Sequence, residues 1–368
     1  MKESNGRGSI VYEPKRKKYR AFFTTPAKRR ISRRFDDRIK ASDWLASQNT
    51  SAISGTYTEP SRLTLGEWLV QWLTEYKKPS VSVRTYDRYL ELAEHFDALA
   101  NTPLQKLTPQ AVQSLYNELL KTLSPTTIER IHRVGHAATQ RANLLGLVAC
   151  NVFDAVERPK SKSIREIEIF TKDELAAIHK AAKHYANGRY MPLISLAIVS
   201  GARRGELLAL RVKDLGETEI RICRNLQETA RSGIIINPPK TKAGNRRVSI
   251  PPAVMTELKL LAQGKPPDAL IFTTSRNTPL SPRNMERAWR IIVEAAEVPY
   301  RNFHVLRHTN ATDLLAKGIP IVEVARRLGH SRISHTLELY GHAIPTYDPT
   351  IAKQIEDLYT FTNAKNEN

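Results

Sequence analysis

Polar and apolar residues alternate along the start of the chain, and this period of two predicts extended strands. Turn-like breaks at 13–14 and 25–26 divide the region. Three runs follow the alternation: 9–12, 19–23 and 30–35. A helical pattern comes next, with an apolar side formed by Ala41, Trp44 and Leu45. The pattern therefore predicts a three-stranded sheet backed by one helix.

From residue 62 to residue 158 the apolar period changes to that of amphipathic helices. Thr64 and Glu67 form a capping box at the start of the first helix. Four successive helices are predicted, with apolar stripes within 65–76, 86–96, 112–120 and 128–134. We expect the Trp and Tyr residues of these stripes to be core residues rather than platforms for stacking on bases.

A charged segment, 157–168, leads to a third region in which helical and strand-like patterns mix. Thr171 and Glu174 form its first capping box. Strand-like runs follow at 219–223, 233–237 and 246–250. The segment between the last two runs, 239–245, is predicted to be a hairpin with lysines near its tip.

These patterns predict a multidomain protein, as expected for a chain of 368 residues. The first domain is a small N-terminal β-sheet plus helix, and the second is an all-α helical bundle. The third is a mixed, mainly-α domain with a small antiparallel sheet. The Ser/Thr-rich segment 49–61 is interpreted as a linker. The expected boundaries are 1–55, 62–158 and 168–350, followed by a tail at 351–368.

The charge of the chain indicates a polyanionic partner. Lys and Arg number 57 against 37 Asp and Glu, a net charge of +20. Residues 1–40 hold fourteen Lys or Arg and four Asp or Glu, so half of the net charge lies there. Membrane binding and export are not expected, because no run of 18 apolar residues and no signal-peptide pattern occurs. The two cysteines, Cys150 and Cys223, form no CxxC pair, which favours a reducing cytosol.

Basic side chains at outward-facing positions are the candidates for contacts with DNA phosphates. In the N-terminal sheet they are Arg20, Arg30, Arg33 and Arg34. In the helical region they are Lys77, Lys78, Arg84, Arg88, Arg130, Arg133 and Arg141. A solvated basic face without a ligand is the alternative for each set.

Four chemically active side chains lie close together in the sequence between residues 303 and 342. Helical spacing places His304 and Arg307 on one face. A helix-ending glycine presents His330, and Tyr340 follows ten residues later. Arg binds phosphate oxygens through its planar fork, His moves protons near neutral pH, and Tyr can act as a nucleophile. The combination points to chemistry on a phosphate.

Further candidates precede this stretch. A sharp turn at Gly201 places Arg203 at the positive end of a helix, where anions are favoured. Glu206 can brace Arg203, although an exposed Arg–Glu pair of little consequence is the alternative. A lysine of the predicted hairpin can give a proton to a leaving oxygen, and both Lys240 and Lys242 are candidates for this role. The alternative is that both are ordinary solvated surface lysines.

His308 is not expected to join this group, because it lies about 100° around the helix from Arg307. His304 and His308 have the i, i+4 spacing of a metal pair. No carboxylate or cysteine completes a ligand set, so a metal site is not expected.

Together these residues resemble the tyrosine recombinases, also called the phage integrase family. The resemblance covers about 170–345, and the order and spacing of its motifs agree with the family. The matching motifs are Gly201-x-Arg203-x-x-Glu206, Pro239-Lys240-Thr241, His304-x-x-Arg307, Leu328-Gly329-His330 and Tyr340. The helical region resembles the family's core-type DNA-binding domain. The basic first 55 residues resemble the arm-binding domain of temperate-phage and integrative-element integrases.

The resemblance implies a role for each matching residue and no cofactor. Tyr340 would attack a phosphodiester and form a 3′-phosphotyrosyl link, without metal or ATP. The assisting residues would be the arginine clamp Arg203 and Arg307, the general acid Lys240, and the histidines His304 and His330. Small departures are Ser200, where the family usually has Thr, and Ala202, where a larger apolar residue is common.

The resemblance also implies partners. The first is double-stranded DNA with core and arm attachment sequences. The second is three further copies of the chain, which would complete a tetramer on DNA. A DNA-bending host protein and an excisionase can join as accessory partners. The expected setting is the cytoplasm of a bacterial host, where the enzyme would integrate and excise a mobile element such as a prophage. The tail carries Ile355, Leu358 and Tyr359 on one helical face, and we expect it to dock on a neighbouring protomer as family tails do.

Two other functions remain open from the sequence. A type IB topoisomerase-like enzyme shares the chemistry and would relax DNA rather than recombine it. A DNA-binding regulator without catalysis would show the same basic surface but would have no need of the full Arg–Lys–His–Arg–His–Tyr set.

Overall fold

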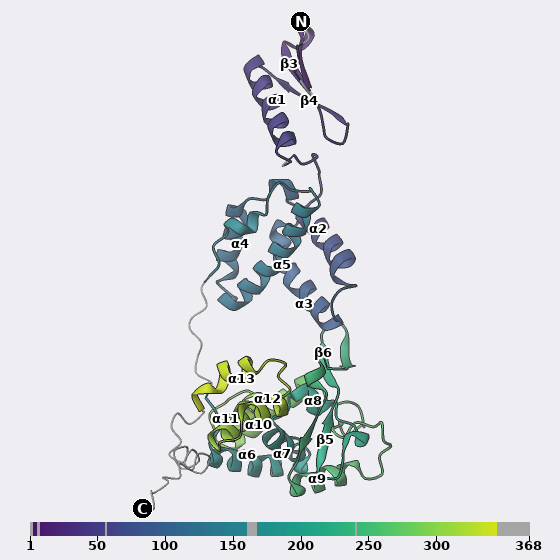
Figure 1. Cartoon of the computed structure of the whole chain (residues 1–368), viewed down its shortest axis with the longest axis vertical. Helices are drawn as coiled ribbons and strands as arrows, with labels where there is room; N and C mark the ends of the chain where they lie inside the picture. Colours follow the sequence, from purple (N-terminus) through teal and green to yellow (C-terminus); the bar gives the residue numbers. More distant parts are fainter. Residues whose placement is uncertain (1–2, 6–7, 56, 160–167, 240, 344–368) are drawn as a thin grey trace, which may run out of the picture. The chain divides into compact units, whose positions relative to one another are not determined.

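The structure, a computed structural model, describes residues 3–5, 8–55, 57–159, 168–239 and 241–343 (Figure 1). It divides into two compact units, Met1–Ser163 and Ile164–Asn368. Lys240 and the tail from residue 351 lie outside the described residues. Within the described part of the chain, no helix is both long and apolar enough to cross a membrane.

The chain opens with an antiparallel sheet whose strands follow one another in sequence order. The strands are β1 (Glu3–Asn5), β2 (Gly8–Glu13), β3 (Lys18–Thr24) and β4 (Arg30–Phe35). The three predicted strands are confirmed, and the short β1 adds a fourth strand at the edge.

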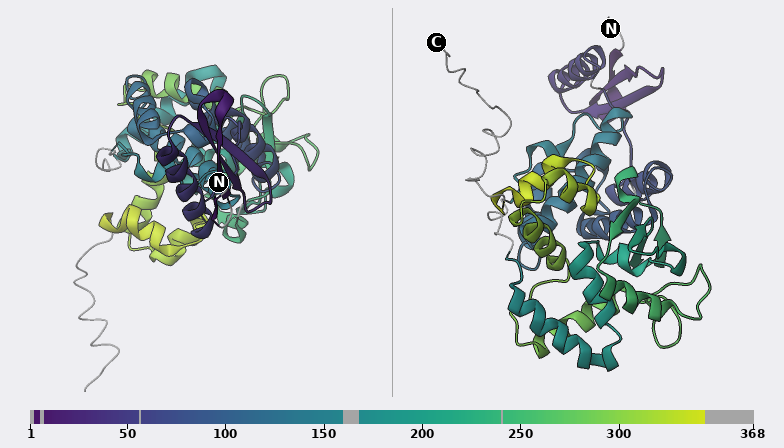
Figure 2. Two further views of the ribbon diagram at one scale, coloured as in Figure 1. Left: turned by 90° about the horizontal axis from the view of Figure 1, so that it is seen from above. Right: turned by 60° about the horizontal axis from the view of Figure 1, so that its bottom comes forward.

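Helix α1 (Arg38–Ile53) covers one face of this sheet (Figure 2). Ala21 and Phe23 of β3 are fully buried beneath it, together with Ala41 of the helix itself. The Asp37 side chain caps the helix by accepting from the backbone N–H of Ile39. The predicted linker therefore starts too early, because residues 49–53 belong to α1.

The rest of the first unit is helical, as predicted. Its α-helices are α2 (Leu65–Trp72), α3 (Val83–Ala93), α4 (Pro109–Leu119) and α5 (Pro125–Leu144). One π-helical turn and three 3-10 turns link or follow them: Leu73–Lys77, Glu94–Leu99, Leu104–Lys106 and Val152–Ala155. Trp68, Trp72 and Tyr116 are at most 1% exposed, so these rings are core residues and cannot stack on bases.

The second unit is mainly α-helical. Its α-helices are α6 (Lys172–His184), α7 (Met191–Ser200), α8 (Arg204–Leu208), α9 (Pro252–Ala262), α10 (Pro282–Ala295), α11 (Val305–Ala316), α12 (Ile321–Leu328) and α13 (Ile333–Tyr340). Capping boxes at Thr171 and at Thr64 are both formed. Short 3-10 turns lie at Tyr185–Gly188, Val212–Asp214, Lys242–Gly244 and Gly341–Ala343.

Two small antiparallel sheets complete this unit. The strands β5 (Glu219–Ile222) and β8 (Arg246–Ser249) form one sheet, and β6 (Asn225–Thr229) and β7 (Gly233–Asn237) form the other. The predicted hairpin between β7 and β8 is wrong, because each of these strands pairs with a different partner. The segment 239–245 instead connects the two sheets. The overall fold class predicted from the sequence is confirmed.

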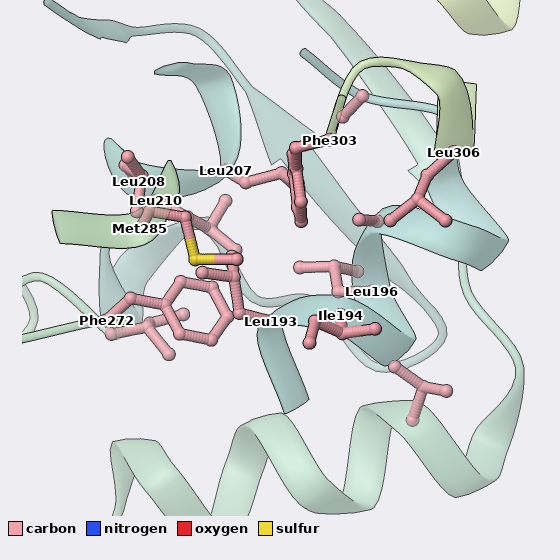
Figure 3. Close-up of a cluster of buried hydrophobic side chains, with 14 of the residues drawn as sticks. Leu193, Ile194, Leu196, Leu207, Leu208, Leu210, Phe272, Met285, Phe303 and Leu306 are labelled. Carbon is pink, nitrogen blue, oxygen red and sulfur yellow. The ribbon is translucent and has the colours of Figure 1, made fainter. Parts of the chain in front are cut away.

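One hydrophobic cluster holds the second unit together and fixes the backbone beside the candidate site. Figure 3 shows Leu207 of α8, Leu306 of α11 and Phe303 packed in this cluster. Each is at most 3% exposed. Their sequence neighbours are Glu206, Arg307 and His304. The packing of the core therefore fixes the backbone positions from which these three polar side chains extend.

Candidate active site

Arg307 is the most deeply buried charged residue of the candidate site, with 2% of its surface exposed. Its guanidinium donates from Nη1 to the Gly201 carbonyl and from Nη2 to the Leu328 carbonyl, each at 2.9 Å. These two bonds join α11 to the ends of α7 and α12. Burial, with the charge of Arg203 nearby, lowers the pKa of Arg307 to about 9, so the group stays charged at neutral pH.

Gly201 adopts a left-handed conformation, with φ of 60°, at the end of α7. A Cβ at this position would lie 2.6 Å from Oδ1 of Asn310. Glycine therefore permits both the sharp turn and the close approach of α11.

His330 lies immediately after α12 and contacts Arg307 directly. Its Nε2 is 2.7 Å from Nη2 of Arg307, and its Nδ1 is 2.7 Å from Oγ1 of the buried Thr336. A guanidinium can only donate, so Nε2 accepts and the proton of the neutral ring is on Nδ1. Partial burial and the nearby Arg307 and Arg203 lower the pKa of His330 to about 3.

Arg203 forms the N-cap of α8 and belongs to a buried charge network. Glu206 accepts from the Arg203 backbone N–H at 2.9 Å and from its Nη1 at 3.0 Å. On its other side Glu206 accepts from Arg246, at 2.8 Å to Nη2 and 3.2 Å to Nη1. Arg246 also donates to the Arg327 carbonyl at 2.6 Å. Glu206 thus braces Arg203 as expected, but its fully buried partner is Arg246.

Glu206→Gln is expected to lower the free energy of unfolding at neutral pH by about 3 kcal/mol, because the buried Arg246 charge loses its counter-ion. Burial alone would raise the pKa of Glu206, but hydrogen bonds and charges from Arg246 and Arg203 lower it below 4.5. The carboxylate therefore stabilises the fold above pH 4.5, and this contribution is lost as the pH falls through the lowered pKa. Thermal unfolding of both proteins from neutral to acid pH measures the effect. A variant with an unchanged melting temperature at neutral pH would contradict it.

Tyr340 is the last residue of α13 and its side chain is 2% exposed. It packs with Ala311, Leu315 and Leu328 in a small cluster separate from the main core. Burial raises the pKa of Tyr340, while the charges of Arg307 and Arg203 act in the opposite direction. The phenol therefore lies within the electrostatic reach of both arginines of the same chain.

The phenol makes its hydrogen bond with His308, at 2.7 Å between Oη and Nδ1. The expectation that His308 faces away from the site is wrong. The ring does diverge from Arg307 around α11, but α13 packs against α11 on that side and brings Tyr340 to it.

His304 forms the N-cap of α11 and is exposed at that end of the helix. Its ring stands perpendicular to that of His308, with centroids 5.0 Å apart. Desolvation and the charges of Arg307, His308 and Arg203 lower the pKa of His304 to about 4. His304 is therefore neutral at physiological pH before any anion binds.

A cavity of about 540 Å³ opens beside these residues. Arg203 and His330 line it, as does His335, whose ring centroid is 4.9 Å from that of His330. Pro239 and Thr241, which flank Lys240, line the cavity too. Lys242 is exposed at the start of the short 3-10 turn. Arg203, Arg224 and Arg332 give the lining positive groups of the kind that bind phosphate, beside the carboxylates of Glu206 and Glu338. Arg307, His304 and Tyr340 are not among the residues that line this cavity.

The candidate DNA-binding residues of the N-terminal sheet divide between its two faces. The strand register places Arg20 opposite Arg34, and Thr24 opposite Arg30, on the face away from α1. Arg33 lies opposite the buried Ala21 and thus points to the helix side, where it stays exposed beside Phe35.

The candidates of the helical region are exposed or partly exposed. Lys78, Arg84 and Arg130 are exposed, and so are Arg88 and Arg133, which form ion pairs along their own helices. Lys77 lies over the rings of Trp72 and Tyr89, and Arg141 lies over Tyr76. Lys77 and Arg141 thus use part of their surface to contact aromatic rings, and only the remaining part can contact DNA.

Comparison with known proteins decides the family. The profile of the Phage integrase family matches residues 168–346. The profile described as Phage integrase, N-terminal SAM-like domain, matches residues 64–120. The chain belongs to the phage integrase family of tyrosine recombinases.

Relatives of this recombinase span most of its length. It is 28% identical to a tyrosine recombinase XerC-like protein of Caldanaerobacter subterraneus subsp. tengcongensis, over 81% of this chain and 84% of the relative. It is 27% identical to the integrase of Mycobacterium phage D29, over 90% of each chain. The recombinase is thus a site-specific integrase-type enzyme that acts on DNA.

Solved structures share its fold. The Tn1549 transposon integrase in complex with a circular intermediate DNA aligns with a TM-score of 0.67 at 18% identity, over 81% of this chain and all of that chain. A lambda integrase tetramer bound to a Holliday junction aligns with a TM-score of 0.59 at 19% identity, over 92% of this chain and 96% of that chain.

Proposed function

We propose that Tyr340 attacks a scissile phosphodiester of the attachment site in line, which forms a 3′-phosphotyrosyl bond and releases a 5′-hydroxyl. Arg203 and Arg307 bind the non-bridging oxygens as negative charge builds up on them. His304 and His330 add hydrogen bonds or proton transfers. One observation supports these roles most: guanidinium, imidazole and phenol groups from different helices of one unit lie close together. Arg307 contacts His330, Tyr340 contacts His308, and the charges of Arg307 and Arg203 act on the phenol.

Lys240 is proposed as the general acid that protonates the leaving 5′-oxygen, with Lys242 as the alternative. Replacing that oxygen by sulfur gives a leaving group that departs without a proton. Cleavage by the variant of the true acid should therefore be restored on the sulfur-containing substrate. Comparing Lys240→Ala with Lys242→Ala on both substrates identifies the lysine.

The covalent link conserves the energy of the broken bond, so a 5′-hydroxyl from a partner strand can reverse the step without ATP. Exchange between two duplexes requires four active sites. We propose that four protomers assemble on the two att sites, by analogy with the lambda integrase tetramer bound to a Holliday junction. A DNA-bending host protein and an excisionase would set the direction, in the cytoplasm of a bacterial cell that carries the prophage or other mobile element.

The three regions are proposed to divide DNA recognition between them. Residues 1–55 bind arm sequences, residues 62–158 bind the core site, and residues 168–350 hold the catalytic residues. The outer face of the N-terminal sheet supports the first assignment, because Arg20, Arg30 and Arg34 share it. Glu13 pairs with Arg20 and Arg34 on the same face and orders their side chains.

Arg30→Ala is expected to weaken arm-DNA binding and to reduce the slope of log K against log salt by about 1, because one phosphate contact is lost. Arg33→Ala is the matched comparison, since its side chain is on the helix side of the same strand. Its effect should be smaller. Fluorescence titrations at several salt concentrations measure both slopes, and equal losses in the two variants would contradict the assignment of the outer face.

A two-site plasmid assay tests the proposed function. The substrate carries the att core found in the DNA that flanks the gene, together with its chromosomal counterpart. A recombinase exchanges the flanking segments. Relaxation of supercoils without exchange would instead favour the type IB topoisomerase-like activity, and binding without any strand breakage would favour a regulator.

A further inference from the structure

The phenol of Tyr340 and the ring of His308 form a close pair contributed by two helices. The Oη–Nδ1 distance of 2.7 Å is that of a well-formed O–H···N hydrogen bond. Tyr340 ends α13, and His308 lies in the first turn of α11. The tyrosine side chain is buried and the histidine is partly buried, so little water competes for the bond.

The surroundings of the pair decide which atom holds the proton. His304 and Arg307 are the ionisable neighbours on α11, and α7, which packs against α11, carries no ionisable side chain. Helix α12 also packs against α11, and there Glu323 pairs with Arg326 while Arg327 donates to the Val199 and Ser249 carbonyls. On α13, besides Tyr340, the ionisable groups are His335, which lies against His330, and Glu338, which lines the cavity. Desolvation and the Arg307 charge lower the pKa of His308, and burial raises that of Tyr340. At neutral pH the phenol therefore keeps its proton and donates it to an unprotonated Nδ1.

The other described histidines of the site are placed less well to take this proton. Both nitrogens of His330 are engaged, one by Arg307 and the other by Thr336. The ring of His304 lies beyond that of His308, which it meets edge-on. Among the described residues, the phenol oxygen of Tyr340 is hydrogen-bonded to His308.

We propose that His308 is a catalytic residue that takes the proton of Tyr340 as the phenol attacks DNA. This inference rests on the proposed role of Tyr340. The O–H bond of Tyr340 breaks and an N–H bond forms at Nδ1 of His308. Oη then bonds to phosphorus, the bond to the 5′-oxygen breaks, and that oxygen receives a proton from the general acid. In the rejoining step His308 returns its proton to the departing phenol oxygen.

The position of Arg307 makes this transfer dependent on DNA. An imidazolium beside a buried guanidinium is unfavourable while the site is empty of anions. A bound phosphodiester contributes a negative charge that offsets both cations. The phenol therefore stays neutral in the free enzyme and becomes a nucleophile once a phosphate is bound.

The test is single-turnover cleavage of a nicked att half-site duplex, with the covalent adduct measured after denaturation. In His308→Gln an amide oxygen can still accept from the phenol but cannot take its proton. Its rate of adduct formation should fall by about 10²–10⁴-fold, the usual contribution of a general base. The wild-type rate should also decline as the pH falls through the pKa of His308, which desolvation and the Arg307 charge hold below 6.5, and this acid limb should be absent in the variant.

His179→Gln is the matched control, because His179 also pairs with a hydroxyl, Oγ of Ser195 at 3.2 Å, in the same unit. Its cleavage rate should equal that of the wild type. A 5′-bridging sulfur in the substrate separates the two proton transfers. The defect of His308→Gln should persist on the sulfur substrate, whereas a defect in the general acid should be restored.

Three results would overturn the role of His308. They are a wild-type rate in His308→Gln, an acid limb that persists in this variant, and recovery of its rate on the sulfur substrate. Comparison of melting temperatures shows whether His308→Gln is folded, and restoration of His308→Ala activity by added imidazole would support the role independently of folding. If the wild type itself forms no adduct, or if Tyr340→Phe still forms one, the proposed function fails and this inference fails with it, whereas the three results above overturn the role of His308 alone.

Discussion

Tyr340→Phe is expected to bind att-site DNA with wild-type affinity and to form no covalent adduct that survives denaturation. The substitution removes only Oη and leaves the ring in its cluster with Ala311, Leu315 and Leu328. The nitrogen of His308 loses its hydrogen-bond donor, which should cost about 1 kcal/mol of stability. Denaturing gel electrophoresis of labelled suicide duplex measures the adduct, and a mobility shift measures the binding.

Tyr300→Phe is the matched control for the nucleophile. Tyr300 is half exposed and its hydroxyl donates to Glu286 at 2.9 Å, away from the arginine pair. The control should form the adduct at the normal rate. Loss of the adduct in Tyr300→Phe or Tyr347→Phe, with retention in Tyr340→Phe, would show that the assignment is wrong.

Arg307→Lys should be the most damaging conservative change in the site. An ammonium is a point donor and cannot reach the Gly201 carbonyl, the Leu328 carbonyl and His330 at once as the guanidinium does. Two buried carbonyls lose their partners, which should lower the free energy of unfolding by about 1–3 kcal/mol. The cleavage rate should fall by about 10²–10³-fold, because the proposed donor to the phosphate is also displaced.

Single-turnover cleavage and thermal unfolding on the same preparation measure the two effects of Arg307→Lys. Arg287→Lys provides the control, since Arg287 is an exposed arginine of α10. A lysine at position 307 that preserves both rate and melting temperature would show that the fork geometry is unimportant.

Much of the fold could be predicted because local patterns determine it. Capping boxes at Thr64 and Thr171 mark true helix starts. Trp68, Trp72 and Tyr116 are buried as their spacing indicates, while the other tyrosines of the stripes are partly buried against the same core. Strand pairing in the second unit could not be predicted in this way. Alternation identifies a strand but not its partner, so the pairing of β7 with the unrecognised β6 was missed.

The site shows the same division between local and long-range information. His304, Arg307, His330 and Tyr340 could be named because each belongs to a compact motif. Arg246 was missed, although its alternation with Val248 in β8 marks it as inward-facing. A buried arginine needs a carboxylate, and its partner Glu206 lies 40 residues away in the sequence.

His308 was misjudged for a related reason. Periodicity gives the direction of a side chain from its own helix axis, and it correctly separates His308 from Arg307. Periodicity cannot predict which other helix packs against that side of α11. The packing of α13 against α11 answers that question, and it depends on the small cluster around Leu315 and Leu328.

The enclosure of Tyr340 has a consequence for the cell. A genome offers roughly 10⁶–10⁹ non-specific sites, and an integrase with an accessible nucleophile would risk nicking any of them during its search. Only 2% of the Tyr340 side chain is exposed, so in the free protein the phenol is shielded from solvent and from passing DNA. Tyr340 shares this enclosure with Leu315 and Leu328, in a cluster separate from the main core, and its hydroxyl is hydrogen-bonded to His308. Burial of the phenol would therefore limit unwanted cleavage of chromosomal DNA by the free protein.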